Sequence, residues 1–319
     1  MINYLKTIQN FTEVIFMYDI VIIGAGTAGL SAAIYGVRAG KKVLVLEGEN
    51  YGGQIINSPE VANYPGIAKI SGFEFATGLY EQAQNLGADI EFEAVTKVEK
   101  EGKDFVVYTE EREIPCHSVI LATGAKNRPL GVEREEAFVG AGVSYCATCD
   151  GAFFRGQVTA VVGGGNTALE DAEFLSAYCE KVYVIHRRDE LRGERWLEES
   201  LRKKENVEFV LNAVVTDIIG EGNVQGIRLK DTKTGESREL AVSGLFVAIG
   251  QIPDNGSFAS LVELDEGGYI RAQEDCRTTS DGVFAAGDCR TKAVRQLTTA
   301  AADGAVAGLA ACEYINKNE

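Results

Sequence analysis

Histidine is scarce in this chain of 319 residues, and long apolar runs are missing. Two histidines give no support for a histidine-based metal site or a catalytic triad, so we expect no bound metal. No stretch approaches the roughly 18 consecutive apolar residues of a membrane span. The small-residue run 298–315 is interrupted by Asp303 and predicts a packed helix. We therefore expect a soluble protein without a membrane partner.

Positive charge is also in short supply. Lysine and arginine number 31 against 47 aspartates and glutamates, which gives a formal net charge of -16. The resulting field repels phosphate backbones and anionic membrane surfaces. We therefore expect no nucleic-acid partner.

The seven cysteines do not follow the pattern of a disulfide-rich secreted protein, because five of them stand singly. These are Cys116, Cys179, Cys276, Cys289 and Cys312. Such usage predicts a reducing, cytoplasmic location. Residues 1–16 lack the features of a signal peptide, and we interpret them as an extension outside the working fold.

A first dinucleotide unit begins with the apolar strand predicted at 19–23, which leads into a GxGxxG turn. Gly24 permits the tight turn and Gly26 lets the backbone approach a pyrophosphate. Gly29 lets the helix predicted over 27–39 pack on the sheet. The expected contacts at this turn are Gly24, Gly26, Thr27, Ala28 and Gly29.

A second unit repeats this pattern. The strand predicted at 158–162 leads into a GxGxxA turn, followed by a helix to about residue 178 and a strand over 182–185. The expected contacts at this turn are Gly163, Gly165, Asn166, Thr167 and Ala168. Two such units predict two dinucleotide sites in one chain.

The two units differ in charge at equivalent strand ends. Counting 21 residues from Gly26 reaches Glu47, whose carboxylate can accept hydrogen bonds from ribose hydroxyls. The same count from Gly165 reaches His186. The cations that follow are Arg187, Arg188 and Arg192. Guanidinium groups pair with a 2'-phosphate, so the second site suits NADPH. The alternative, a solvated charged face over 187–202, is disfavoured by this shared register.

A dithiol lies just upstream of the second turn. Cys146 and Cys149 form a CxxC, and Asp150 follows at once. A zinc site is disfavoured because four ligands are needed and no second CxxC is present. As a redox pair, the cysteines suit a chain that carries electrons from a nicotinamide through a flavin to a disulfide. Asp150 can hand a proton to the departing thiolate, and a helix-capping role for it stays open.

The chain closely resembles the low-molecular-weight bacterial thioredoxin reductases from residue 17 to its C-terminus. The resemblance is carried by these motifs: GAGTAG at Gly24, GGQ at Gly52, NYPG at Asn63, ATGA at Ala122, CATCDG at Cys146, GGGNTA at Gly163, HRRDELR at His186, GLFVAIG at Gly244, GVFAAGDC at Gly282 and RQLTTAAADG at Arg295.

The resemblance implies an α/β fold with two Rossmann-like dinucleotide-binding domains, the NADPH domain being inserted into the FAD domain. On this chain the FAD domain would comprise 17–128 and 257–319, and the NADPH domain, with the CxxC, 129–256. The family is homodimeric, so we expect a homodimer. The flavin would be lined by Gly52, Gly53, Gln54, Asn63, Thr123, Gly124, Gly287, Asp288, Arg295 and Gln296.

The resemblance also implies the activity of a thioredoxin-disulfide reductase that passes electrons from NADPH through FAD to thioredoxin. Cys149 would be the sulfur beside the flavin and Cys146 the one that attacks thioredoxin. Phe153 and Phe154 would help to receive the protein substrate. One departure is Ala141, where the family often has a basic residue, and it puts the details of thioredoxin docking in question.

Three other activities are compatible with parts of this pattern. They are a ferredoxin-dependent flavin thioredoxin reductase, a flavin-dependent dithiol oxidase, and a redox-sensing flavoprotein that is not an enzyme. The intact nucleotide fingerprint over 163–168 disfavours the first two, since neither uses a nicotinamide. A thioredoxin-dependent assay with NADPH separates the enzyme from the sensor.

Overall fold

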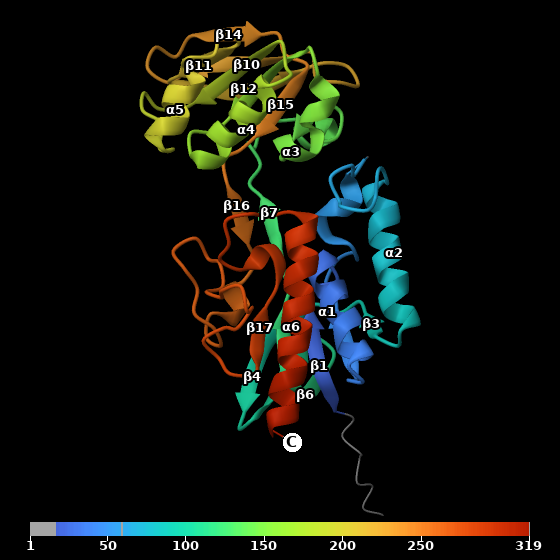
Figure 1. Cartoon of the computed structure of the whole chain (residues 1–319). Helices are drawn as coiled ribbons and strands as arrows, with labels where there is room; N and C mark the ends of the chain where they lie inside the picture. The colour runs from blue at the N-terminus through green and yellow to red at the C-terminus, as the bar shows by residue number, and fades with distance from the viewer. Residues whose placement is uncertain (1–16, 59, 319) are drawn as a thin grey trace, which may run out of the picture. The chain divides into compact units, whose positions relative to one another are not determined.

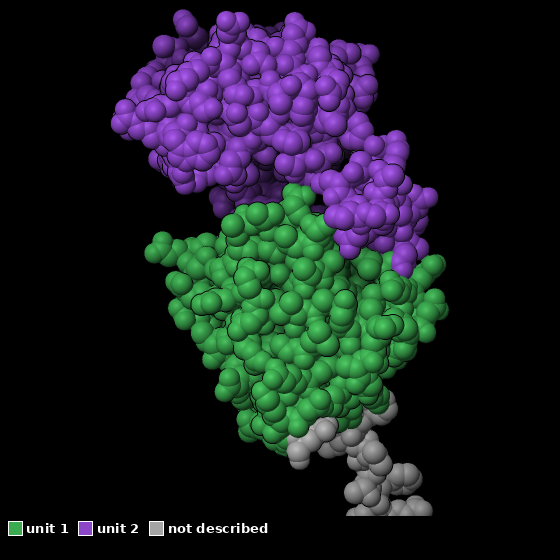
Figure 2. All heavy atoms as spheres, viewed as in Figure 1, with its two compact units in different colours: residues 1–51, 79–123, 255–319 green, residues 52–78, 124–254 purple. Residues whose placement is uncertain are grey.

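The computed structural model describes residues 17–58 and 60–318, so the extension expected at 1–16 lies outside it. The described residues form two compact units (Figure 2). Unit 1 comprises 17–51, 79–123 and 255–318, and unit 2 comprises 52–78 and 124–254. The sequence predicts a different kind of division, into an FAD-binding domain (17–128 and 257–319) and an inserted NADPH-binding domain (129–256). That division is defined by cofactor binding, and it stays a prediction.

Unit 1 is built on a seven-stranded sheet within the described residues, in the order β3-β2-β1-β6-β5-β4, with β17 beside β6. Its strands are β1 (Tyr18–Ile23), β2 (Val43–Leu46), β3 (Asp89–Glu91), β4 (Val95–Glu101), β5 (Asp104–Thr109), β6 (Glu113–Leu121) and β17 (Val283–Ala285). β1 pairs in parallel with β2, which is apolar and buried, and with β6, of which residues 118–121 are buried. Such continuous apolar runs form because both faces of a parallel sheet are covered.

Two helices lie side by side in unit 1, namely α1 (Thr27–Arg38) and α6 (Leu297–Asn318) (Figure 1). Small residues let their backbones approach, since a Cβ added at Gly304 would lie 2.2 Å from the carbonyl oxygen of Ala28. A Cβ at Gly308 would lie 2.8 Å from that of Ala32. This close packing fixes α6 against the helix that follows the first glycine turn.

Unit 2 is built on a second parallel sheet, in the order β11-β10-β9-β15-β8. Its parallel strands are β8 (Val143–Ser144), β9 (Val158–Val162), β10 (Lys181–His186), β11 (Val207–Leu211) and β15 (Gly244–Val247). The antiparallel sheets are formed by β12 (Ala213–Ile219), β13 (Gly226–Asp231) and β14 (Ser237–Leu240), and by β7 (Ala125–Asn127) with β16 (Gln251–Pro253). The expected strand at 158–162 is found with those bounds.

The remaining helices complete the fold. The α-helices are α2 (Gly72–Asn85), α3 (Ala147–Asp150), α4 (Asn166–Ser176) and α5 (Arg195–Leu201). The 3₁₀ helices are η1 (Gly53–Asn57), η2 (Glu136–Phe138), η3 (Gly151–Phe154), η4 (Gly256–Phe258) and η5 (Gly287–Cys289). Across the described residues, no helix is long and apolar enough to cross a membrane. The expected α/β class with two Rossmann-like units is confirmed.

Candidate active site

The first glycine turn joins β1 to α1, and at two of its glycines the neighbouring backbone leaves no space for a side chain. Gly24 has a φ of +108°, and a Cβ there would lie 2.4 Å from the carbonyl oxygen of Ala122. A Cβ at Gly29 would lie 1.9 Å from the carbonyl oxygen of Gly24. Both positions therefore require glycine. A Cβ at Gly26 would meet no atom within 4 Å, so this side of the turn has room for a ligand.

Glu47 follows β2 and braces this turn. Its Oε2 accepts a hydrogen bond from the backbone N–H of Ala25 at 2.7 Å, and its Oε1 accepts one from the N–H of Glu49 at 2.9 Å. Each carboxylate oxygen has a second lone pair, so the expected contact with ribose hydroxyls is compatible with this bracing role. Thr27 and Ala28, the first residues of α1, are both buried.

The second turn has the same design between β9 and α4. A Cβ at Gly163 would lie 2.3 Å from the carbonyl oxygen of Ala248, whereas one at Gly165 would meet nothing within 4 Å. The open position is therefore the middle glycine of the motif, as at Gly26. Ala168 is buried, while Asn166 and Thr167 are exposed at the start of α4.

The predicted phosphate-binding segment packs directly on this turn. The backbone N–H of Arg192 donates to the carbonyl oxygen of Gly164 at 2.6 Å. Asn166 accepts the N–H of Glu194 through Oδ1 at 2.7 Å, which ties the segment to the start of α4. The side chains of Arg187, Arg188 and Arg192 are exposed. The structure therefore brings the second glycine turn and these cations together.

His186 lies beneath the same turn rather than on the surface. A Cβ at Gly164 would come within 2.3 Å of its ring, and its Nε2 is buried with no hydrogen-bond partner among the described residues. Burial and the charge of Arg192 lower the pKa of His186, so its ring is neutral at pH 7. An unpaired ring nitrogen under a nucleotide-type turn suits contact with a ligand.

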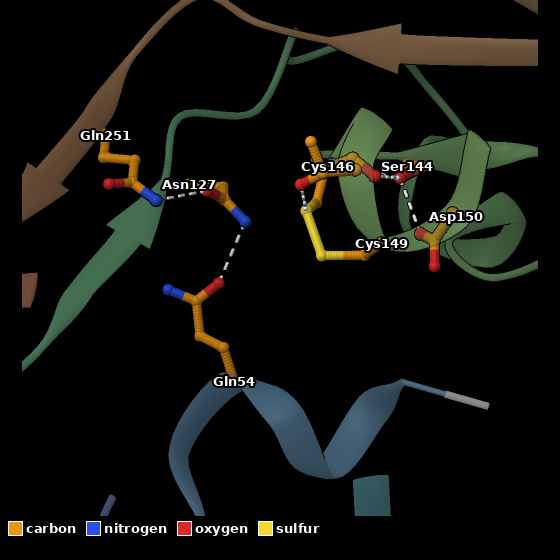
Figure 3. The surroundings of a disulfide bond; sticks show 8 residues. Gln54, Asn127, Ser144, Cys146, Cys149, Asp150 and Gln251 are labelled. Carbon is orange, nitrogen blue, oxygen red and sulfur yellow. Dashed lines mark hydrogen bonds between the residues drawn. A yellow bond between two sulfur atoms is a disulfide. The ribbon is translucent and has the colours of Figure 1, made fainter. Parts of the chain in front are cut away.

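The dithiol is oxidised, with a disulfide between Cys146 and Cys149 and a Cα–Cα distance of 5.3 Å (Figure 3). Cys146 precedes the first residue of α3, and the backbone N–H groups of Cys149 and Asp150 donate to its carbonyl oxygen at 3.2 and 3.1 Å. Both sulfurs thus lie on one short helical turn.

Asp150, which follows Cys149, is held by Ser144, a residue that no sequence motif pointed to as functional. The hydroxyl of Ser144 donates to Asp150 Oδ2 at 2.6 Å (Figure 3). The other oxygen, Oδ1, is buried without a hydrogen-bond partner among the described residues. Burial raises the pKa of Asp150 and the Ser144 hydrogen bond opposes that rise. A carboxyl in this setting is suited to holding a proton.

A third turn, η5, carries Asp288. Its Oδ1 is buried and has no hydrogen-bond partner among the described residues. Burial raises the pKa of Asp288, whereas the charges of Lys292 and Arg295 oppose that rise. A buried carboxylate oxygen without a partner fits the hydroxyl of a bound ligand, as the flavin assignment requires. Arg295 Nε donates to the carbonyl oxygen of Asp288 at 3.4 Å, and α6 begins two residues later.

Asp303, in α6, anchors the η5 turn. Its Oδ2 accepts hydrogen bonds from the backbone N–H of Gly287 at 2.9 Å and from Lys292 Nζ at 2.8 Å. The guanidinium of Arg290, which is 1% exposed, donates to both of its oxygens, at 2.7 and 2.8 Å. In the sequence, Asp303 is distinguished only as an interruption of a run of small residues. Three separate donors from one turn converge on it.

Gln54, one of the residues expected to line the flavin, forms hydrogen bonds with two residues of β7 in unit 2. Its Nε2 donates to the carbonyl oxygen of Ala125, and its Oε1 accepts from Asn127 Nδ2 at 2.9 Å. Asn127 Oδ1 in turn accepts from Gln251 Nε2 at 3.0 Å (Figure 3). This chain of amides links η1 to the paired strands β7 and β16.

The remaining predicted residues have varied surroundings. Gly52 and Gly124 have φ angles of +92° and +67°, which favour glycine, and Asn63 is exposed. Thr123 donates to Asn255 Oδ1 at 2.8 Å, and Gln296 donates its N–H to Thr299 Oγ1 at 3.1 Å. Gly53 opens η1 with a φ of +66°.

Phe153 and Phe154 face different surroundings. Phe153 is 47% exposed, as a docking residue would be. Phe154 packs edge-on against Phe246, with ring centroids 5.3 Å apart. Its ring is therefore part of the unit 2 core.

The chain matches the family model described as pyridine nucleotide-disulphide oxidoreductase over residues 18–304. The chain belongs to this family. A relative named thioredoxin reductase from Treponema pallidum (strain Nichols) is 44% identical over 300 residues, covering 94% of this chain and 97% of the relative. One of the same name from Mycolicibacterium smegmatis is 45% identical over 305 residues, covering 95% and 98%.

A solved structure of this oxidoreductase family agrees with the sequence relatives. The thioredoxin reductase from Streptococcus pyogenes MGAS5005 matches with a TM-score of 0.89 at 41% identity, covering 94% of this chain and 99% of that one. The resemblance predicted from the motifs is thereby confirmed. Membership of the family makes the protein an oxidoreductase.

The nucleotide groups expected of such an oxidoreductase fit the residues that are present. Gly26 and Gly165 are open on the side where a Cβ would lie, although the flanking glycines are tightly packed. Asp288 Oδ1 and His186 Nε2 are buried without a hydrogen-bond partner among the described residues, so each could form a hydrogen bond with a bound nucleotide. Within the residues that the structure describes, no cluster of side chains could hold a metal ion.

Proposed function

We propose that the protein is an NADPH-dependent thioredoxin-disulfide reductase that contains FAD. The observation that carries the proposal is the Cys146–Cys149 disulfide, in a chain with two glycine turns that have opposite charges at equivalent strand ends. Glu47 follows β2 in the first unit, and Arg187 and Arg188 follow β10 in the second. The names of the relatives support the same activity.

The first turn would hold the FAD pyrophosphate against the open side of Gly26, with Glu47 on the ribose. Asp288 would accept a hydroxyl of the ribitol chain. The second turn would hold NADPH, with Arg187, Arg188 and Arg192 on the 2'-phosphate. Bound FAD would supply two-electron transfer between the nicotinamide and the disulfide.

The cysteines would divide the remaining chemistry. Electrons enter the disulfide at Cys149, the S–S bond breaks, and Cys146 is released as a thiolate. Cys146 then attacks the disulfide of thioredoxin and forms a mixed disulfide, which Cys149 resolves. Asp150 holds the proton that neutralises the departing sulfur and takes it back when Cys146 must attack.

Two further parts of the proposal concern the whole protein. We propose a homodimer, as the resemblance implies, and a cytoplasmic location. In support of the location, the five cysteines outside the CxxC are all buried as thiols rather than joined in disulfides. A reducing compartment maintains thiols in that state.

A steady-state assay tests the activity. The flavin-loaded protein should oxidise NADPH only when oxidised thioredoxin is added, with one thioredoxin disulfide reduced for each NADPH consumed. Cys146→Ser should lower thioredoxin reduction by at least about 10³-fold, because the attacking sulfur is gone. NADPH oxidation that is indifferent to thioredoxin, or a Cys146→Ser variant with full activity, would refute the proposal.

A further inference from the structure

Ser144 occupies a junction between the dithiol and Asp150. It closes β8, two residues before Cys146, and is 5% exposed. Its Oγ accepts the backbone N–H of Cys146 at 3.1 Å and donates to Asp150 Oδ2 at 2.6 Å. One hydroxyl is therefore bonded to the residue that carries the attacking sulfur and to the carboxyl that holds the proton.

The direction of the hydroxyl proton follows from counting lone pairs. A second acceptor, the carbonyl oxygen of Cys146, lies 3.3 Å from Ser144 Oγ. That carbonyl already accepts the N–H groups of Cys149 and Asp150, which use both of its lone pairs. The single hydroxyl proton of Ser144 is thus committed to Asp150 Oδ2. This is also the shorter of the two contacts, as expected for a carboxylate acceptor.

The same geometry distinguishes the two oxygens of Asp150. Oδ2 is occupied as an acceptor, whereas Oδ1 is buried and unpaired among the described residues. A proton bound to Asp150 therefore resides on Oδ1. It is held there without competition from another acceptor and remains available for transfer.

Other titratable groups surround this turn. Cys146 and Cys149 do not titrate while they are joined in the disulfide. Just before α3, Tyr145 donates its hydroxyl to Glu135 Oε1 at 2.7 Å. From α4, Asp171 accepts the N–H of Ala147, and burial together with Glu170 raises the pKa of Asp171 to about 7. Tyr178 reaches Gly151, where a Cβ would lie 2.8 Å from its hydroxyl.

We propose that Ser144 is a positioning residue that orients Asp150 and limits how strongly this carboxyl retains its proton. The inference rests on the proposed function, because it refines the role given to Asp150 there. Two electrons from NADPH break the S–S bond, and the Oδ1 proton moves to the departing Cys146 sulfur. The resulting Asp150 carboxylate is stabilised by the Ser144 hydroxyl. When Cys146 attacks the thioredoxin disulfide, the proton returns to Oδ1, a mixed disulfide forms, and the displaced thioredoxin sulfur leaves as a thiolate.

Removal of the Ser144 hydroxyl should raise the pKa of Asp150. The Ser144 hydrogen bond favours the ionised form of Asp150, so its loss raises the pKa of that carboxyl further. A hydrogen bond to a charged group is strong enough to move a titration midpoint upward by about one pH unit. The protonated form of Asp150 then persists to higher pH.

The test is a pH titration of the aspartate carboxyl carbons by ¹³C NMR on the oxidised, full-length protein, with Asp150→Asn to assign the signal. Ser144→Ala should raise the Asp150 midpoint by about one pH unit. Ser144→Thr keeps a hydroxyl at this position, so its Asp150 midpoint should equal that of the unsubstituted protein. Ser118→Ala is the matched control, because it removes another buried hydroxyl, bonded to the carbonyl oxygen of Gly282 at 2.9 Å, and should leave Asp150 unchanged. If Ser144→Ala does not fold, Ser144→Gly removes the same group.

An unchanged or lowered midpoint in Ser144→Ala or Ser144→Gly would overturn the inference. The titration needs neither NADPH nor thioredoxin, so its outcome is separate from that of the activity assay. In turnover, the high-pH limb of thioredoxin reduction should move upward by the same amount as the midpoint. A fall in rate without movement of that limb would mean that Ser144 acts only on stability.

Discussion

At the scale of single residues, the functional turns depend on buried carboxylates that lie on neighbouring elements. Asp303 holds the backbone of Gly287 and two cations, Arg290 and Lys292, in a buried cluster. Burial alone would raise the pKa of Asp303, but its hydrogen bonds from Arg290 and Lys292 outweigh burial and hold the pKa below its usual range. A carboxyl with a lowered pKa stabilises the fold above its unfolded pKa of about 3.9.

Asp303→Asn should therefore lower the free energy of unfolding by about 3–5 kcal/mol at pH 7, because two buried cations lose their counter-charge. The difference from the unsubstituted protein should shrink as pH falls below about 4 and the native carboxyl becomes protonated. Urea denaturation at several pH values measures both effects. Glu263→Gln is the control, since its pair with Arg271 is exposed and contributes less than about 1 kcal/mol. Equal losses in the two variants would contradict the assignment.

At the scale of elements, each strand–turn–helix unit combines two tightly packed glycines with one open glycine. The packed positions define the turn, whereas the open ones, Gly26 and Gly165, have no structural need for glycine. Glycine at these positions is what the proposed nucleotide sites require, because the ligand would approach the backbone there. The two units can therefore be tested separately by the same chemical change.

Gly26→Ala should keep the unfolding midpoint of the protein within a few degrees, yet weaken FAD binding by at least about tenfold, because the added methyl group occupies the pyrophosphate position. Gly165→Ala should leave FAD bound and raise the KM for NADPH by a similar factor. Flavin fluorescence on titration of the apoprotein measures the first effect and steady-state kinetics the second. Normal binding of both nucleotides in both variants would show that neither turn is a nucleotide site.

The sequence predicted the repeated units well, because their signals are local. Apolar strands, glycine spacing and the matching count to Glu47 and His186 all lie within about 30 residues, and the strand at 158–162 was found with the expected bounds. It did not predict the contacts of Ser144 or the anchoring of Gly287 by Asp303, 16 residues away. These pairs are also close in the sequence, but they depend on the conformation of the chain between β8 and α3 and between η5 and α6, which residue spacing alone does not define.

At the scale of the whole molecule, redox chemistry is confined to one pair of sulfurs. The five cysteines outside the CxxC are buried, and burial raises the pKa of Cys116 and Cys276 to about 12. Thiols of that kind are poor nucleophiles at neutral pH. This agrees with the proposed route, in which electrons leave the protein through the Cys146–Cys149 disulfide.

An anaerobic titration of the FAD-loaded protein, followed by its visible absorbance, tests this electron route most directly. NADPH should bleach the flavin, NADH should do so much more slowly, and oxidised thioredoxin should then restore the colour. In Cys146→Ser the bleaching should remain and the restoration should be lost. A flavin that NADPH does not bleach, or colour that does not return when thioredoxin is added to the unsubstituted protein, would contradict the proposed route.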